Sequence, residues 1–214
     1  MRVEIWSDIV CPWCYIGKRR LEQALTGFGH ADDVEVRYRS FELDPSFPAD
    51  RPHPVLELLA AKYGMSAAQA REAEAGVAAK AAADGLDFTA DRLMGNTFDA
   101  HRLVQLAADR DLQEPLLSQL YQAYFGAGQP VFAAAELVPL AAEAGLDPAE
   151  AAHVLSDGGY GDAVRADEAE ARALGITGVP FFVVDRKYGI SGAQPAQTIV
   201  SALETAWDGQ SAAR

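Results

Sequence analysis

Hydrophobic and polar residues alternate in two short segments near the N-terminus. In the first segment, RVEIWSDIV, Val3 and Ile5 fall on one face. In the second, VEVRYRSF over residues 34–41, the hydrophobic positions are Val34, Val36 and Tyr38. A period of two residues is typical of a half-buried β-strand. A helix that begins at Pro12, a residue suited to the first helical position, would connect the two strands. Residues 1–41 are therefore predicted to form a β-α-β unit.

The middle of the chain is rich in alanine and other helix-favouring residues. It follows a proline-rich connector over residues 44–54 and continues to about residue 175. Glycines and prolines divide this block into segments of helical length. Helices are predicted over residues 54–63, 66–83, 97–110, 114–125, 133–144, 147–156 and 160–174.

Strand patterns return near the C-terminus. The segment VPFFVVDRKYGIS predicts two short strands joined at Asp185–Lys187, and QPAQTIVSALETAW predicts a closing helix. Strands on both sides of a helical block indicate one sheet domain with an insertion. We therefore expect an α/β protein with a split sheet domain, formed by residues 1–45 and 176–214. The helical insertion domain and its connecting helix are expected over residues 46–175.

Composition and charge restrict the classes of partner. The chain has 214 residues, of which 50% are hydrophobic and 23% charged, as in globular proteins with a sizeable core. Lys and Arg number 18 against 31 Asp and Glu, which gives a net charge of −13 and disfavours nucleic acid and anionic membranes as partners. The sequence as given opens without a basic segment followed by an apolar run, so we expect a cytoplasmic protein.

The two cysteines of the chain lie in one motif, CPWC, at the predicted junction of the first strand and helix. A helix that begins at Pro12 directs its free N–H groups toward Cys11, and this stabilises a thiolate. Cys11 is therefore the expected nucleophile. Cys14 lies one helical turn further along, where it can resolve a mixed disulfide formed at Cys11.

Two other interpretations of the motif are less favourable. Half a zinc site would need a second pair of ligands, but the chain has no further cysteine. Its four histidines, at positions 30, 53, 101 and 153, lack the spacing of zinc ligands. We therefore expect no metal site. A purely structural disulfide across so short a loop would add little stability.

A second motif precedes the strand that begins near Phe181. A cis bond between Val179 and Pro180 would let the backbone of Val179 face an extended substrate lying across Cys11. The alternative is an ordinary trans proline that opens a strand, where its missing N–H breaks no ladder.

Several segments together resemble the DsbA-like thioredoxin-fold oxidoreductases, and most closely their FrnE-like branch. They are DIVCPWCYIG at residues 8–17, NTFDAHRL at 96–103, and GITGVPFFVV at 175–184 followed by GAQ at 192–194. The resemblance implies a thioredoxin fold with an inserted all-helical domain. It also implies that Cys11 attacks, that Cys14 resolves and that Val179–Pro180 forms a cis-proline loop.

The sequence departs from this family at two places near the cysteines. The dipeptide between them is Pro12-Trp13, whereas the strongly oxidising members have Pro-His. Without that histidine the disulfide is expected to be less oxidising. Thioredoxin also keeps a buried Asp in its first strand as a proton acceptor. Asp8 is the candidate substitute here, and its alternative is a solvated position at the strand end.

The same fold hosts a second chemistry. FrnE-like chains are also similar to 2-hydroxychromene-2-carboxylate isomerases and kappa-class glutathione transferases, which bind glutathione and have serine at the position of Cys11. By this similarity Asn96, His101, Gly192 and Gln194 would line a substrate or glutathione site. The alternatives are that Asn96 or Thr97 only caps the following helix and that His101 is a surface residue.

The sequence thus predicts a thiol–disulfide oxidoreductase acting on protein or small-molecule thiols and disulfides. Substrate-binding positions are expected at Pro12, Trp13, Val179 and Pro180, around Cys11. No cofactor is expected, with glutathione left open as a cosubstrate. Two alternatives stand beside this prediction: a glutathione-dependent isomerase or transferase for a small aromatic or polyketide-like substrate, and a redox-responsive holdase. The oligomeric state stays open, a homodimer included.

Overall fold

The computed structural model describes the backbone of residues 1–211 and the side chains of residues 1–209. The chain divides into two compact units. Unit 1 takes residues 1–43 and the chain from Ala166 onward, and unit 2 takes Asp44–Arg165. The sequence predicted that the chain returns from the insertion to the sheet domain between residues 175 and 176. In the structure it returns between Arg165 and Ala166, within a single helix, α8 (Gly161–Ala173).

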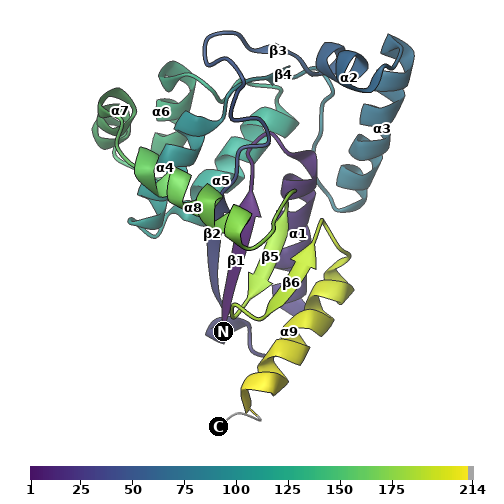
Figure 1. Cartoon of the computed structure of the whole chain (residues 1–214), viewed down its shortest axis with the longest axis vertical. Helices are drawn as coiled ribbons and strands as arrows, with labels where there is room; N and C mark the ends of the chain where they lie inside the picture. The colour runs from purple at the N-terminus through teal and green to yellow at the C-terminus, as the bar shows by residue number, and fades with distance from the viewer. Residues whose placement is uncertain (212–214) are drawn as a thin grey trace. The chain divides into compact units, whose positions relative to one another are not determined.

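Unit 1 is built on a four-stranded sheet with the order β2-β1-β5-β6 (Figure 1). The strand β1 (Arg2–Ser7) pairs in parallel with β2 (Glu35–Ser40) and antiparallel with β5 (Phe181–Val184), which in turn pairs with β6 (Tyr188–Ser191). The predicted first strand is β1, and it is buried on both faces from Val3 to Ser7 because it is a central strand of the sheet.

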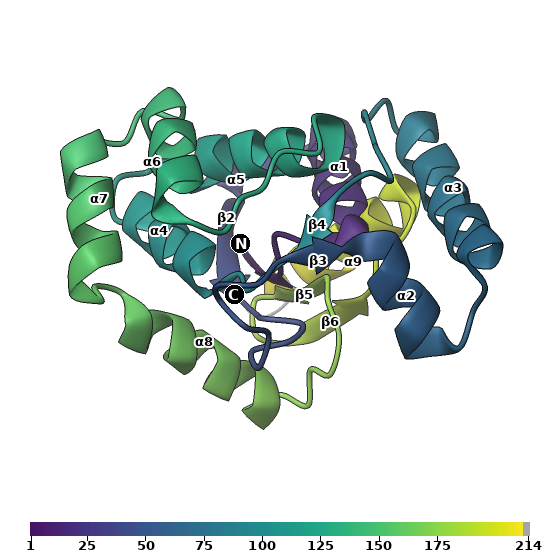
Figure 2. The same ribbon diagram turned by 90° about the horizontal axis from the view of Figure 1, so that it is seen from above.

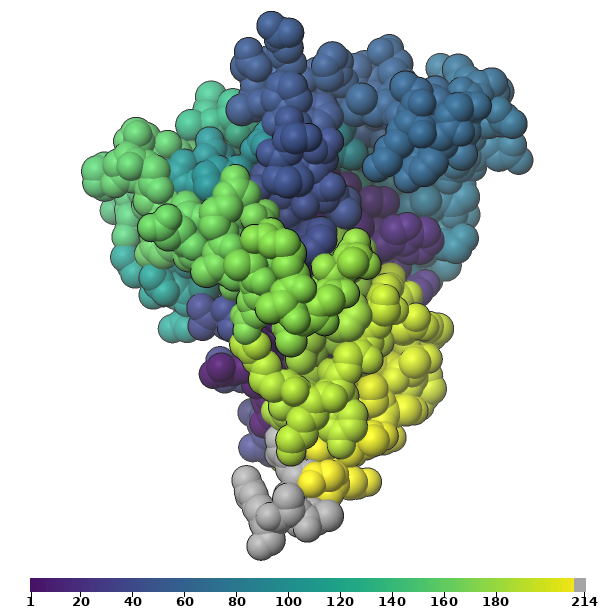
Figure 3. All heavy atoms as spheres, viewed as in Figure 1, coloured from purple at the N-terminus to yellow at the C-terminus, as the bar shows by residue number. Residues whose placement is uncertain are grey.

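Helices cover both faces of this sheet (Figures 1 and 2). The helices α1 (Pro12–Gly27) and α9 (Ala196–Ser211) contact each other and lie on one face, and the C-terminal half of α8 lies on the other. A short 3-10 turn, Ala31–Asp33, leads from α1 into β2. The turn between β5 and β6 is exposed at Arg186 and Lys187, and α9 forms part of the surface seen in Figure 3.

The C-terminal half of α8 belongs to unit 1 because it packs on the sheet. Trp6 and Val183 from the sheet form an apolar cluster with Ala171 and Ile176. The indole N–H of Trp6 donates a hydrogen bond of 2.9 Å to the carbonyl oxygen of Asp167. These contacts explain why the unit boundary falls before residue 166 and not after the helix.

Unit 2 is mostly helical, as predicted. Its complete helices are α2 (Val55–Tyr63), α3 (Ala67–Ala83), α4 (Phe98–Ala108), α5 (Gln113–Tyr121), α6 (Ala134–Glu143) and α7 (Pro148–Asp157). A π-helical turn over Gln122–Gly126 extends α5. Unit 2 also has a two-stranded antiparallel sheet of β3 (His53–Pro54) and β4 (Leu93–Met94), so the expectation of an all-helical insertion is wrong in this detail. A ladder of two residues has no periodicity that the sequence could display.

A buried ion pair stands in the interior of unit 2. The guanidinium of Arg92 donates a hydrogen bond of 2.8 Å to Glu74. The same guanidinium lies 4.3 Å from the ring centroid of Phe88 and 4.9 Å from that of Phe125. Charge pairing and ring faces together compensate the lost hydration of this cation.

None of the helices in the described part of the chain has the length and hydropathy of a membrane-spanning segment.

Candidate active site

The CPWC motif forms the start of α1. Cys11 occupies the N-cap position with an extended backbone, and Pro12 is the first helical residue, as expected. The carbonyl oxygen of Cys11 accepts hydrogen bonds from the N–H groups of Cys14 and Tyr15, at 3.0 and 3.2 Å. Both cysteines are free thiols and both are buried, so Cys14 is hardly less accessible than Cys11.

The loop before β5 meets the N-terminus of α1. The Cys11 thiol donates to the carbonyl oxygen of Val179, with 3.5 Å between Sγ and O. The Val179–Pro180 peptide bond is cis. Gly17 allows α1 to lie close to the Val179–Pro180 loop, because a Cβ atom at its position would lie only 2.9 Å from Cγ of Pro180. The structure therefore brings Cys11, Val179 and Pro180 together, residues that the sequence assigned to one site.

A third segment, after β6, is tied to the same loop. The N–H of Gly192 donates a 2.8 Å hydrogen bond to the carbonyl oxygen of Pro180, and Gly192 has a left-handed backbone with φ of 77°. Arg20 of α1 donates to the carbonyl oxygen of Ala193 at 2.6 Å. The side chain of Gln194 donates to Ser191 of its own loop at 2.8 Å. Gly192 thus lies beside the proline loop, whereas the Gln194 amide stabilises the turn.

The two thiols interact with each other. Burial, and then the hydrogen bond and charge of neighbouring Cys11, raise the pKa of Cys14 well above its ordinary value of 9.0. The side chain of Ser7 and the backbone of Asp8 donate hydrogen bonds that act in the opposite direction. Cys14 is therefore held as a neutral thiol at neutral pH. Ser7 was not predicted from the sequence, because a serine at a strand end has no distinguishing pattern.

Asp8 is not a solvated residue at the strand end, so that alternative is wrong. It is 1% exposed, and its carboxylate accepts a hydrogen bond of 2.8 Å from the N–H of Leu43. Burial of the carboxylate follows from its place between β1 and α1, where the chain beyond β2 passes over it.

Asn96 and His101 belong to unit 2. The side-chain oxygen of Asn96 accepts from the N–H of Phe98 at 2.9 Å, and its amide donates to the carbonyl oxygen of Phe47 at 3.1 Å. Asn96 therefore caps the first turn of α4, which is the structural role that the sequence left open. His101 is 2% exposed within α4, so it is not a surface residue. A role of either residue in lining the site stays a prediction.

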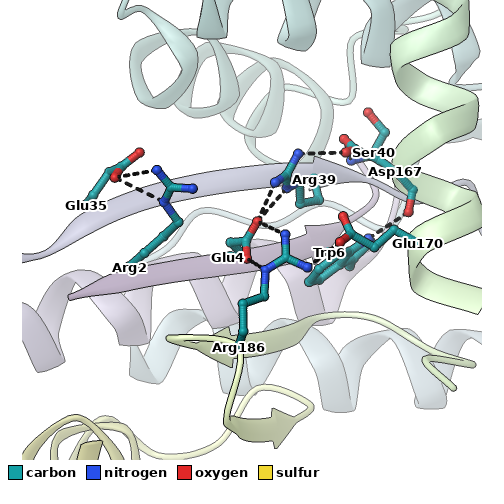
Figure 4. A network of polar contacts seen from close by, with 9 residues as sticks. All are labelled: Arg2, Glu4, Trp6, Glu35, Arg39, Ser40, Asp167, Glu170 and Arg186. Atoms are coloured by element: carbon teal, nitrogen blue, oxygen red, sulfur yellow. Dashed lines mark hydrogen bonds and ion pairs between the residues drawn. The ribbon is translucent and has the colours of Figure 1, made fainter. Parts of the chain in front are cut away.

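A network of charged residues crosses the sheet of unit 1 and was not predicted (Figure 4). Glu4 of β1 is 1% exposed and accepts hydrogen bonds of 2.9 Å from Arg39 of β2 and from Arg186 of the β5–β6 turn. Arg39 also pairs with Asp167 of α8 at 3.0 Å. Arg186 completes the network from a left-handed backbone with φ of 59°. The network joins β1, β2 and the β5–β6 turn to α8.

Metal ligands are sparse around the thiols. Among the residues whose side chains the structure describes, no three His, Cys, Asp or Glu side chains are grouped so that they could hold a metal ion. The arrangement of unit 1 instead places a helix N-terminus, a pair of thiols in contact and a peptide carbonyl at one point.

Comparison with known proteins agrees with this arrangement. The family model of the DSBA-like thioredoxin domain matches residues 2–204. The chain belongs to this family. The predicted thioredoxin-like fold with a helical insertion is therefore confirmed, and the family together with a 55% identical probable oxidoreductase supports an oxidoreductase kind of enzyme.

Three solved structures are similar to this chain. A probable DsbA oxidoreductase from Streptomyces coelicolor is 55% identical, with a TM-score of 0.94 over 97% of this chain and 90% of that chain. A 2-hydroxychromene-2-carboxylate isomerase is 14% identical, with a TM-score of 0.72 over the full length of both chains, 100% of each. The cytosolic disulfide reductase DsbM from Pseudomonas aeruginosa, solved with GSH, is 18% identical, with a TM-score of 0.65 over 96% of this chain and 98% of that one. The last two similarities establish the fold alone.

Proposed function

We propose that this DSBA-like protein is a thiol–disulfide oxidoreductase whose redox centre is the Cys11–Cys14 pair. The observation that carries the proposal is that the Cys11 thiol contacts both the Cys14 thiol and the Val179 carbonyl oxygen, 3.5 Å away, at the N-terminus of a helix. A helix N-terminus favours a thiolate, and a second thiol in contact with the first allows an internal disulfide.

The reaction proceeds in two exchanges. The Cys11 thiolate attacks one sulfur of a substrate disulfide, forms a mixed disulfide and releases the other substrate sulfur as a thiolate. Cys14 then attacks the Cys11 sulfur, forms the internal disulfide and releases the second substrate thiol. The substrate gains two electrons and the protein loses them. The exchanges are reversible, so the reduction potential of the partner sets the direction.

The backbone around Val179 would bind the substrate. An extended peptide or small disulfide that crosses Cys11 would meet the edge at Val179 and Pro180, where the proline loop lies against the thiol. Trp13 of the CPWC motif is 37% exposed and offers an apolar contact surface next to Pro12. Gly192, whose N–H is bound to Pro180, would widen this surface on one side.

A cytoplasmic location is part of the proposal. The chain has two cysteines, both within the CPWC motif, so no other pair is left for a structural disulfide. Structural disulfides are common in oxidising compartments, whereas a lone catalytic pair suits a reducing one.

Trapping of the mixed disulfide tests the function. The Cys14→Ser variant is incubated with glutathione disulfide or with insulin whose disulfides are intact. It should keep an adduct that intact-mass measurement detects and that a reductant removes. The Cys11→Ser variant, in which the nucleophile is replaced, should form almost none. The unmodified protein should instead end as the internal disulfide.

Two other outcomes would replace the proposal. If Cys14→Ser forms no adduct but a glutathione-dependent isomerisation of an aromatic substrate persists, the protein is an isomerase, since that chemistry needs no resolving thiol. If neither activity appears and suppression of aggregation survives the loss of both cysteines, the protein is a holdase.

A further inference from the structure

Cys11 stands at the end of a four-residue turn that begins at Asp8. The N–H of Cys11 donates a hydrogen bond of 3.2 Å to the carbonyl oxygen of Asp8. The helix α1 follows at Pro12, and the N–H groups of its first turn donate to the carbonyl oxygen of Cys11. The position of the Cys11 sulfur therefore depends on two elements, the helix after it and the turn before it.

The side chain of Asp8 ties this turn to the chain that follows β2. Its carboxylate accepts a hydrogen bond of 2.8 Å from the N–H of Leu43, 35 positions later in the chain. Asp8 is 1% exposed, and burial of a carboxylate is costly unless hydrogen-bond donors replace the lost water. One residue thus accepts two hydrogen bonds, through its backbone from Cys11 and through its side chain from Leu43.

The segment that supplies this second donor is itself fixed. Its four successive N–H groups, of residues 40–43, all donate hydrogen bonds. The acceptors are the carboxylates of Asp167, Glu168 and Asp8 for residues 40, 42 and 43, at 2.9, 3.4 and 2.8 Å, and the carbonyl oxygen of Ser7 for residue 41, at 3.2 Å. The bond from Ser40 to Asp167 is drawn in Figure 4. The segment is thereby bound to both β1 and α8, and it gives Asp8 a partner that does not move.

The attack on a substrate disulfide depends on where the Cys11 sulfur lies. This sulfur is 3.5 Å from the carbonyl oxygen of Val179, along which the substrate is proposed to bind. A displacement of about 1 Å can cost a reaction as much as about a hundredfold in rate. A side chain that fixes the turn before Cys11 therefore contributes to the reaction even if it touches no substrate.

We propose that Asp8 is a positioning residue for the Cys11 nucleophile, and that it acts by accepting the N–H groups of Leu43 and Cys11 together. The inference rests on the proposed function, because it concerns the attack of Cys11 on a substrate disulfide. In that step the Cys11 sulfur forms a bond to one substrate sulfur, the substrate disulfide breaks, and the other substrate sulfur leaves with the electron pair as a thiolate. Asp8 neither gains nor loses a proton. This role differs from that of the proton acceptor in thioredoxin.

Two substitutions at Asp8 separate a hydrogen-bond anchor from a charge. Asp8→Asn keeps an oxygen that accepts the N–H of Leu43, whereas Asp8→Ala removes it. The reduced protein is mixed with excess glutathione disulfide, and samples are quenched at intervals with N-ethylmaleimide in denaturant. Intact mass then counts the thiols that remain, and the loss of the doubly labelled protein gives the rate of attack by Cys11.

The rate of attack should fall about tenfold or more in Asp8→Ala, because the turn before Cys11 is released, and should stay within about threefold of the unmodified rate in Asp8→Asn. Alkylation of Cys11 by iodoacetamide, which needs no disulfide placed against Val179, should fall in neither variant. Asp185→Ala is the matched control, because the Asp185 carboxylate accepts the N–H of Arg2 at 2.7 Å, at the opposite end of β1. It should leave both rates unchanged.

Three results would overturn the role of Asp8 and leave the redox centre intact. If Asp8→Asn is as slow as Asp8→Ala, the charge or the proton of the carboxylate matters and not the anchor. If Asp8→Ala reacts as fast as the unmodified protein, the turn needs no anchor. If alkylation falls as much as attack on the disulfide, the substitution has changed the reactivity of the thiol and not its position.

Two further measurements keep the test decisive. Circular dichroism shows whether Asp8→Ala is folded, and if it is not, Asp8→Leu, which fills the same space without an acceptor, takes its place. An unmodified protein whose Cys11 does not react with glutathione disulfide or with insulin would refute the proposed function, and the role of Asp8 with it.

Discussion

The sulfur atom of Cys11 lies 3.5 Å from the carbonyl oxygen of Val179, although the two residues stand 168 positions apart in the chain. The contact exists because β1 and β5 are adjacent antiparallel strands. The C-terminal end of β1 therefore lies beside the N-terminal end of β5, and the turn after β1 meets the loop before β5. The geometry of the candidate site therefore depends on how closely α1 approaches this loop.

Gly17 determines that approach, so Gly17→Ala should impair activity. The added Cβ would lie 2.9 Å from Cγ of Pro180, and the loop must shift away from Cys11. We expect turnover of a disulfide substrate to fall about tenfold, because small misplacements at a reacting centre are costly. The free energy of unfolding should fall by about 1–3 kcal/mol from overpacking, offset in part by the better helix propensity of alanine.

Gly27→Ala is the control for this substitution, because it lies in the same helix with its nearest neighbour, Val200, 4.0 Å from the added atom. Turnover measurements and urea unfolding of both variants check the prediction. Equal activity of the two variants would contradict the idea that the Gly17 contact positions the proline loop.

Arg20 should matter for substrate affinity more than for rate. Its guanidinium donates to the carbonyl oxygen of Ala193, next to Gly192, which is itself bound to Pro180. Arg20→Met keeps the aliphatic stem but releases this loop, so KM should rise by about threefold to tenfold while kcat changes little. Arg19→Met is the control, since Arg19 is 43% exposed and pairs with Glu22 of its own helix. Steady-state kinetics of both variants decide the matter, and equal KM values would count against a role of Arg20.

Glu4 should be the most sensitive carboxylate of unit 1. Glu4→Gln removes the charge that two arginines share and leaves Arg39, whose side chain is 17% exposed, partly uncompensated. The free energy of unfolding should fall by about 3 kcal/mol, near the lower end of the range for a buried pair, because Arg186 is 45% exposed.

The matched control for Glu4 is Glu35→Gln, which disrupts an ion pair with Arg2 on the surface of the same sheet, with side-chain exposures of 57% and 50%. That change should cost less than about 1 kcal/mol. Urea denaturation measures both, and a cost for Glu4→Gln no larger than that of the control would mean that the network adds little stability.

The sequence was informative where a feature is local or repeats along the chain. Helix positions in unit 2 and the CPWC motif at the start of α1 are of this kind, since capping residues, prolines and periodicity act within a few positions. Contacts between distant segments leave no local pattern in the sequence. Glu4 occupies a polar position in a segment where hydrophobic and polar residues alternate, and only the fold brings Arg39 and Arg186 beside it. Ser7 is likewise an ordinary polar residue until β1 places it against Cys14.

The stability of the reduced protein should decline at alkaline pH through Cys14. Its pKa in the folded protein lies well above the ordinary value of 9.0, chiefly because burial disfavours the thiolate. Above that value the unfolded chain loses the thiol proton while the folded protein retains it, so the unfolded state binds fewer protons and the free energy of unfolding falls as pH rises. One such group contributes a slope of at most about 1.4 kcal/mol per pH unit. Urea unfolding under a phosphine reductant, compared between the unmodified protein and Cys14→Ala, isolates this contribution, because all other ionisable residues are common to the two proteins. The difference between the two curves should be constant below the ordinary pKa and should shift in favour of Cys14→Ala above it. Parallel curves across the alkaline range would show that Cys14 ionises as readily in the folded protein as in the unfolded chain.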